Sequence, residues 1–343
     1  MINSNIKIQG YDLLGRNGQD GIRFAWSYLQ KNTIIESASF VNRSKTVNDN
    51  VCGYTTSVSA GCLLKAMKSP CLFCRTGILL PFKGPLTYYD IAKQNVFMVL
   101  ADLSCKDHKE LYNKKREFAY MGQGEPGFAY TQVRMAIELT NKVMKKLGQK
   151  VYRHILSTSG IPEAIVAFKQ DLKNYYTERV TLHISLHATK YRDYVMPINK
   201  FYSYTEVLKA ASDIYSISGD KPCIGIMLFK DFIPQKGEFG YTNNFNEVKQ
   251  ILSEINPDQY RISLCEFNSS NDVCSSQIYD RNEIEVILSY AKKKGYDIKF
   301  FSSFGKKEQT ACGMLAGKNP DYSASEKFEM LDKQAEQLIY DCI

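Results

Sequence analysis

The sequence predicts an α/β protein built on a parallel sheet, as a barrel or a partial barrel. The first observation is a rhythm after about residue 115, where short β-rich runs alternate with longer helical patterns. Such alternation is typical of βαβ units, whose strands run parallel. The second observation is the number of units, because so many in succession favour a barrel over an open sheet. The third is length, since 343 residues can bury a sizeable core without cross-links.

The expected elements follow one another along the chain. Strands are predicted over residues 118–121, 151–157, 179–187, 223–229, 260–267 and 298–304. Helices are predicted over residues 131–147, 162–172, 204–217, 245–255 and 282–294. In the first of these helices, Val133, Ile137 and Met144 recur at helical spacing, which indicates one buried face.

The strand expected over residues 179–187 separates two faces, because successive side chains alternate across a sheet. Leu182, Ile184 and Leu186 point one way, toward covering helices. The opposite face carries Thr181, His183, Ser185 and His187. A fully buried parallel strand is normally apolar on both faces. The polar face therefore predicts either a lumen that holds water or a polar ligand, or a pair of hydrogen-bonded structural histidines.

The two ends of the chain have other patterns. Residues 21–28 and 33–41 predict a small β-hairpin ahead of the barrel. Residues 323–343 predict a terminal helix with Phe328, Leu331 and Leu338 on one face. The expected organisation is an N-terminal extension over residues 1–48, a barrel core over 49–317 and a C-terminal helix over 318–343.

Composition narrows the class of protein. Hydrophobic residues make up 44% and charged residues 23% of the chain, which excludes a largely disordered or fibrous protein. The longest apolar run, residues 223–229, is too short to span a membrane, and no signal peptide is visible. A cytoplasmic protein without a membrane partner is therefore expected. The net charge of +8 fits a nucleic-acid partner and fits a lysine-rich solvated surface equally well.

The ten cysteines are the first sign of chemistry. In a cytoplasmic chain they are expected to be reduced, and Cys52, Cys62, Cys71 and Cys74 crowd together. Three thiolates at positions 62, 71 and 74 suit three irons of a [4Fe–4S] cluster and leave the fourth iron open. A zinc site on all four cysteines is the alternative, and the spacing by itself leaves both open.

Short motifs at the ends of the expected strands indicate a ligand pocket. Gly124, Glu125 and Pro126 follow the first strand, where glycine lets the backbone approach a ligand and a carboxylate holds an ammonium group. The other motifs are Ser157-Thr158-Ser159-Gly160, Ser185-Leu186-His187-Ala188, Pro197-Ile198-Asn199 and, near the C-terminus, Ala311-Cys312-Gly313 with Leu315.

This ordered set resembles the radical S-adenosylmethionine (SAM) methyltransferases of the RlmN/Cfr type, from about residue 35 to residue 317. The resemblance implies a partial (β/α)6 radical SAM barrel, a [4Fe–4S] cluster on Cys62, Cys71 and Cys74, and SAM at the open iron. It also implies a SAM pocket that includes Gly124, Glu125, Ser157, Ser185, Leu186, His187 and Asn268.

The resemblance implies methylation of an sp2 carbon of an adenine-type nucleic-acid or nucleotide substrate. Cys312 matches the cysteine that carries the methyl group, in keeping with the nucleophilicity of a thiolate. Cys52 matches the cysteine that resolves the adduct between protein and substrate. An electron donor such as a flavodoxin or a ferredoxin is implied as a further partner.

Three departures from the family pattern keep a second hypothesis open. Eight residues rather than three separate Cys62 from Cys71. Asn42 occupies the place of a catalytic glutamate, and an amide is no general base at neutral pH, so Asp49 or Glu36 would have to serve. Only about 35 residues precede the match, where a helical RNA-recognition domain is expected. The alternative is a radical SAM enzyme with non-methylating chemistry on a small molecule or another substrate.

Overall fold

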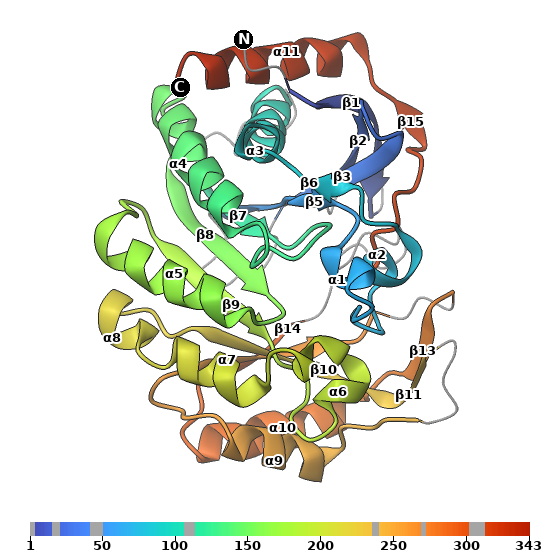
Figure 1. Ribbon diagram of the computed structural model, residues 1–343, viewed down its shortest axis with the longest axis vertical. Helices are drawn as coiled ribbons and strands as arrows, with labels where there is room; N and C mark the ends of the chain where they lie inside the picture. The colour runs from blue at the N-terminus through green and yellow to red at the C-terminus, as the bar shows by residue number, and fades with distance from the viewer. Residues whose placement is uncertain are drawn as a thin grey trace.

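The computed structural model describes residues 4–15, 21–41, 51–105, 114–234, 240–268, 272–301 and 313–343. Within these residues the central feature is one sheet of eleven strands in the order β14-β12-β10-β9-β8-β7-β4-β3-β2-β1-β15. Helices cover one side of the sheet, and the short helices α1 and α2 lie on the other side (Figure 1). The fold is thus mixed α/β, as the sequence predicts.

Seven consecutive strands of this sheet run parallel. They are β4 (Val51–Thr55), β7 (Lys115–Tyr120), β8 (Val151–Thr158), β9 (Val180–Ser185), β10 (Cys223–Leu228), β12 (Arg261–Glu266) and β14 (Ile298–Phe301). The predicted parallel sheet is therefore confirmed. β14 covers residues 298–301 of the last predicted strand, and residues 302–304 lie outside the described residues.

The connecting helices pack on the outer face because each carries an apolar stripe. They are α3 (Tyr88–Leu103), α4 (Tyr130–Lys146), α5 (Pro162–Asn174), α7 (Tyr204–Ala211), α8 (Ile214–Ser218), α9 (Phe245–Ser253) and α10 (Arg281–Lys293). The single helix expected over residues 204–217 is wrong, because α7 ends at Ala211 and α8 begins at Ile214. The side chains of Ser and Asp compete for backbone hydrogen bonds, and here Ser212 Oγ donates to the carbonyl of Lys209.

The N-terminal strands form more than the predicted hairpin. Strands β2 (Gly21–Tyr28) and β3 (Thr33–Val41) have the predicted bounds, and β1 (Ile6–Leu14) adds a third antiparallel strand. The sequence hides β1 because Gly10 and Asp12 occupy buried positions in its alternating pattern, where apolar residues would be the usual signal. β3 then pairs with β4, so the sheet is continuous across the expected boundary at residue 48.

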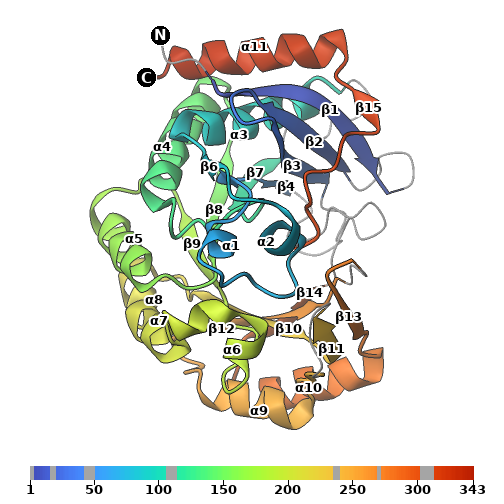
Figure 2. The same cartoon turned by 45° about the vertical axis from the view of Figure 1, so that its right-hand side comes forward.

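The C-terminal residues return to the N-terminal strands. β15 (Tyr322–Ser323) pairs with β1, and α11 (Glu326–Tyr340) packs against α3. Figure 2 shows the segment before β15, in red, running between the edge of the N-terminal strands and α2. The predicted face of the terminal helix packs on aromatic rings, since Phe328 contacts both Phe24 and Phe97.

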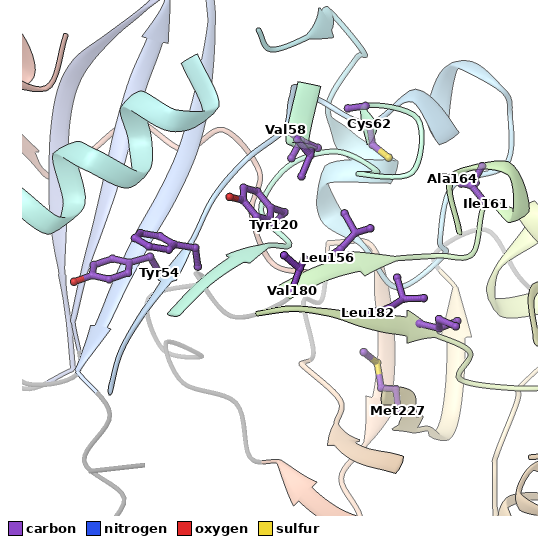
Figure 3. Close-up of a cluster of buried hydrophobic side chains, with 14 of the residues drawn as sticks. Tyr54, Val58, Cys62, Tyr120, Leu156, Ile161, Ala164, Val180, Leu182 and Met227 are labelled. Atoms are coloured by element: carbon purple, nitrogen blue, oxygen red, sulfur yellow. The ribbon is translucent and has the colours of Figure 1, made fainter. Parts of the chain in front are cut away.

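Shorter elements complete the structure. They are β5 (Ser59–Ala60) with β6 (Gly84–Pro85), α1 (Leu63–Ala66), α2 (Arg75–Leu79), α6 (Arg192–Val195), the 3-10 helix Pro197–Lys200, and β11 (Lys230–Pro234) with β13 (Cys274–Gln277). Figure 3 shows part of the core, in which Leu156 and Leu182 from neighbouring strands lie near Ile161 and Ala164. In the described part of the chain, no helix combines the length and apolarity that crossing a membrane requires.

Candidate functional site

Glu125 joins the ends of two neighbouring parallel strands. Its carboxylate follows β7 and accepts a hydrogen bond from the backbone N–H of Ser159 at 2.7 Å, beyond the end of β8. The hydroxyl of Thr158 and the N–H of Gly127 also donate to it, the latter at 2.8 Å. A carboxylate has about four acceptor positions, so these three bonds leave room for one further donor. The carboxylate is thereby fixed in place while it can still receive a ligand group.

Gly124 lets the backbone before Glu125 pass close to the loop ahead of the cysteines. Its φ is +103°, and a Cβ added there would lie 2.1 Å from Ser59 Oγ. Only glycine combines that backbone conformation with so close an approach. The predicted roles of Gly124 and Glu125 in the pocket remain proposals, and the structure places both residues at the same strand edge.

Arg192 connects three of the motifs. Its guanidinium is fully buried and donates to the carbonyls of Ser159, Ser185 and Leu186, which end β8 and β9. It also donates to Asn199 Oδ1 at 3.0 Å, which belongs to the Pro197-Ile198-Asn199 motif. Burial lowers the pKa of Arg192 to about 10, and the nearby Cys71 and Glu125 oppose that shift. The Arg192 guanidinium therefore holds the ends of β8 and β9 in place at the centre of the site.

The three predicted ligand cysteines lie on one loop on the inner side of the sheet. Cys62 precedes α1 and Cys74 precedes α2, while the N–H of Cys74 donates to the carbonyl of Cys71 at 3.1 Å. Burial raises the pKa of the Cys71 thiol well above its ordinary value, and the nearby sulfurs of Cys74 and Cys62 raise it further. Figure 3 shows the Cys62 sulfur pointing away from the ribbon of its loop. The three thiols thus share one environment.

The eight residues between Cys62 and Cys71 fold as an anchored helical turn. Leu64 of α1 is buried, and Lys65 Nζ donates to the carbonyl of Ile78 in α2 at 2.6 Å. The N–H of Leu72 donates to the carbonyl of Val195 in α6 at 3.0 Å. The hydrogen bonds of Lys65 and Leu72 therefore hold the two ends of this longer loop against α2 and α6.

His187 lies beside this loop in a constrained conformation. Its φ is +61°, a value that residues other than glycine rarely adopt. Its ring packs edge-on against Phe73, between Cys71 and Cys74, and its Nδ1 accepts a hydrogen bond from the N–H of Met227 at 3.1 Å. Burial, with Arg192 nearby, lowers the pKa of His187 to about 3, so the imidazole is neutral at physiological pH.

The other predicted pocket residues lie at or near the ends of their strands. Ser157 and Ser185 are half-buried on β8 and β9, Leu186 is buried just after β9, and Asn268 is buried after β12. Ser159 was not predicted, although it lies in one of the motifs. It is nine-tenths buried, and within the described residues its hydroxyl has no hydrogen-bond partner. An uncompensated buried hydroxyl costs about 1–3 kcal/mol, which a bound polar ligand could offset.

The motif near the C-terminus begins outside the described residues. Cys312 lies outside them, as do Asn42 and Asp49. The residues after Cys312 are held next to the cysteine loop: the N–H of Arg75 donates to the carbonyl of Gly313 at 2.8 Å, and the hydroxyl of Thr76 donates to the carbonyl of Leu315 at 2.7 Å. The fold thus brings the C-terminal motif to the residues that follow Cys74.

Residues 315–321, which we call the strap, then cross a buried charged network on the N-terminal strands. Glu36 forms an ion pair with Arg23 at 2.6 Å and accepts hydrogen bonds from Gln123 Nε2 and the N–H of Gly317. Arg23 also pairs with Asp12. Glu36 therefore joins the strap to the loop that carries Gly124. The sequence does not reveal this connection.

Among the described residues of the predicted site, Cys52 lies near the start of β4, at the opposite end of the parallel strands from the strand-end motifs. It shares a face of β4 with Tyr54, whose hydroxyl donates to Asp102 of α3 at 2.6 Å and accepts a hydrogen bond from Arg116 at 2.7 Å. Burial and the charge of Asp102 raise the pKa of Cys52 to about 11. Among the described residues, no group of three or more His, Cys, Asp or Glu side chains is arranged to hold a single metal ion.

The relatives found by comparison with known proteins share one name. The chain is 30% identical over 275 residues to a probable dual-specificity RNA methyltransferase RlmN of Pseudothermotoga lettingae, covering 78% of this chain and 70% of the relative. A Thermotoga petrophila protein of the same name is 26% identical over 299 residues, covering 85% and 75%. No protein-family model matches the chain. The crystal structure of a radical SAM methyltransferase from Sphaerobacter thermophilus has the same fold, with TM-score 0.71, 16% identity and coverage of 92% of this chain and 82% of that one.

Proposed function

The chain belongs to the radical SAM methyltransferases of the RlmN/Cfr type, and on that basis we propose that it methylates an sp2 ring carbon of adenosine in RNA. The names of its relatives support RNA as the substrate. The resemblance of its motifs supports adenosine. The continuous run of seven parallel strands with six helical connections supports the partial (β/α)6 barrel.

The residues present fit the two cofactors that this reaction needs. Cys62, Cys71 and Cys74 supply three thiols to a [4Fe–4S] cluster, whose ligands sit on separate irons rather than around one ion. Glu125 offers its remaining acceptor position to the ammonium group of SAM, and the Ser159 hydroxyl offers a further hydrogen bond. When bound, the cluster and SAM supply the methyl group and the radical chemistry of the family.

In this proposal Cys312 accepts the methyl group and delivers the carbon to the substrate. The observation that carries it is the hydrogen bonding of Gly313 and Leu315 to Arg75 and Thr76, directly behind a cluster cysteine. That contact supports a position for the C-terminal motif at the site rather than elsewhere on the molecule. We further propose a cytoplasmic enzyme reduced by a flavodoxin or a ferredoxin, in keeping with ten cysteines that need a reducing compartment.

The test is peptide mass spectrometry of anaerobically reconstituted protein incubated with SAM that carries an isotopically labelled methyl group. Label is expected on the tryptic peptide 308–318, which contains Cys312. The peptide 334–343, which contains Cys342, serves as an internal control for non-specific methylation and stays unlabelled. An unmodified Cys312 in protein that still cleaves SAM would exclude the methyl-carrying role and favour non-methylating radical chemistry.

A further inference from the structure

A polar groove lies on the N-terminal strands beside the strap. Its volume is about 440 Å³, and residues of β1, of the β2–β3 hairpin and of the strap line it. Clefts of this size suit small ligands or single nucleotides. We call this feature the hairpin groove. None of the residues assigned to the SAM pocket lines it, so it is a separate site.

The hairpin groove opens at the same edge of the sheet as the strand-end motifs. β3 runs antiparallel to β4 and pairs Ala38 with Thr55, so residues 33–37 extend beyond the C-terminal end of β4. The carbonyl of Ile34, which lines the groove, accepts a hydrogen bond from Gln123 at 3.2 Å. Gly317 on the opposite side is held by Glu36 at 2.6 Å. The groove is thus tied both to the Gly124 loop and to the strap after Cys312.

The lining of the groove favours nucleobases over charged ligands. It presents the side-chain amides of Gln9, Asn32 and Asn319 and the hydroxyls of Ser27 and Thr33, with the Ser27 hydroxyl donating to Gln9 Oε1 at 3.3 Å. Among the lining residues there is no Lys, Arg, His, Asp or Glu. Amides both donate and accept hydrogen bonds, as the edges of unpaired bases require. A phosphate group or a carboxylate would find no cation at the base of this groove.

Cations are placed at its rim instead. Lys31 lies in the hairpin turn between Leu29 and Asn32, and Lys318 lies in the strap between Gly317 and Asn319. Both lysines are exposed, and Lys318 Nζ pairs with Asp321 at 3.1 Å in the exposed strap, an ion pair that RNA phosphates could replace. Rim lysines around an uncharged floor match single-stranded RNA, whose bases turn inward while its phosphates face solvent.

We propose that the hairpin groove binds unpaired bases of the RNA substrate next to the nucleotide that is methylated. This inference rests on the proposed function and deepens it, because it assigns substrate recognition to the N-terminal strands. In this chain the strands β1 and β2, the hairpin turn and the strap supply the contacts to RNA.

The test compares RNA affinity in a groove variant and a matched control. The groove variant is Asn32→Gly/Asn319→Ala, with glycine at position 32 because φ there is +44° and alanine would be strained. The control is Asn246→Ala/Asn282→Ala, which removes two exposed amides from α9 and α10. The probe is a fluorescent RNA hairpin with unpaired adenosines in its loop, titrated by anisotropy against the holoenzyme.

We expect the groove variant to raise the Kd for this RNA by about tenfold, the scale of one or two lost base contacts. The control and the wild type should bind alike, and the Kd for SAM should not change. Equal RNA affinity in groove variant and wild type would overturn the inference and leave the proposed function intact. A wild-type protein that cleaves SAM but binds neither this RNA nor its methylated product would overturn the proposed RNA substrate itself.

Discussion

Two regions meet at the candidate site, and each is held together by buried charge. On the parallel strands, Glu125 and Arg192 fix the motif residues at the ends of β7, β8 and β9. On the antiparallel strands, Arg23 and Glu36 fix the strap. The first region consists of short motifs in which neighbours in sequence are neighbours in space. The second combines residues from β1, β2, β3 and the strap, so pattern reading finds the motifs of the first region but neither Arg192 nor this network. One half of a functional site can therefore be recognised from sequence motifs while the other half is recognised only in the folded structure.

The largest expected effect comes from removing the central cation of the parallel region. Arg192→Met leaves three carbonyls and Asn199 without their donor, and the free energy of unfolding should fall by more than about 3 kcal/mol. Urea titration followed by circular dichroism measures this. Arg179→Met is the control, because Arg179 is exposed and pairs with Asp220 at the surface. A surface ion pair contributes about 1 kcal/mol or less to the free energy of unfolding. Equal losses in both variants would show that Arg192 does not organise the strand ends.

The matching change in the antiparallel region is Glu36→Gln. It removes the charge that faces Arg23 and should lower the free energy of unfolding by about 1–3 kcal/mol. Hydrogen exchange at the Gly317 amide should accelerate, because that N–H loses a charged acceptor. Affinity for SAM should change little, since Glu36 is not among the predicted pocket residues. If exchange at Gly317 stays unchanged while methylation is lost, Glu36 acts as a proton acceptor rather than as a support for the strap.

Lowering the pH should destabilise the parallel region more than the antiparallel one. The sequence places His154, His183 and His187 in the parallel region and no histidine in β1, β2 or β3. Burial lowers the pKa of His154 from 6.5 to about 3. Between those values the unfolded chain binds a proton that the folded chain does not, so stability falls as pH falls. His154 should contribute a slope of up to about 1.4 kcal/mol per pH unit.

The variant His154→Gln should flatten the pH dependence of unfolding by that amount. The measurement is urea unfolding at several pH values between neutrality and the acid limit of the folded state. An identical slope in wild type and variant would mean that the buried imidazole takes up its proton without unfolding. His154 hydrogen-bonds Tyr120 and Asn141, outside the pocket, so SAM affinity at neutral pH provides the control.

The smallest expected effect is that of Cys52→Ala. The thiol lies on the α3 side of β4, so its loss should cost about 1 kcal/mol of stability by leaving a small cavity. Labelling of Cys312 by SAM should persist in this variant. The resolving role that the motif comparison predicts for Cys52 makes a different prediction, a covalent RNA–protein adduct that accumulates in the variant. Gel electrophoresis under denaturing conditions separates the two outcomes.

The sequence by itself determined the alternating architecture and the motif half of the site. Periodicity marks the parallel strands and their helices because burial repeats at fixed spacing, and the glycines, Glu125 and the three cysteines are chemically distinctive. Tertiary structure alone decided the rest. It placed Asp12, Arg23, Glu36 and Gly317 together, since ion pairs between distant segments leave no local pattern. It gave Arg192 its position between three motifs, although a single arginine carries no recognisable signal in a sequence. It also turned Cys52 toward α3, because the face of a strand depends on what packs against it.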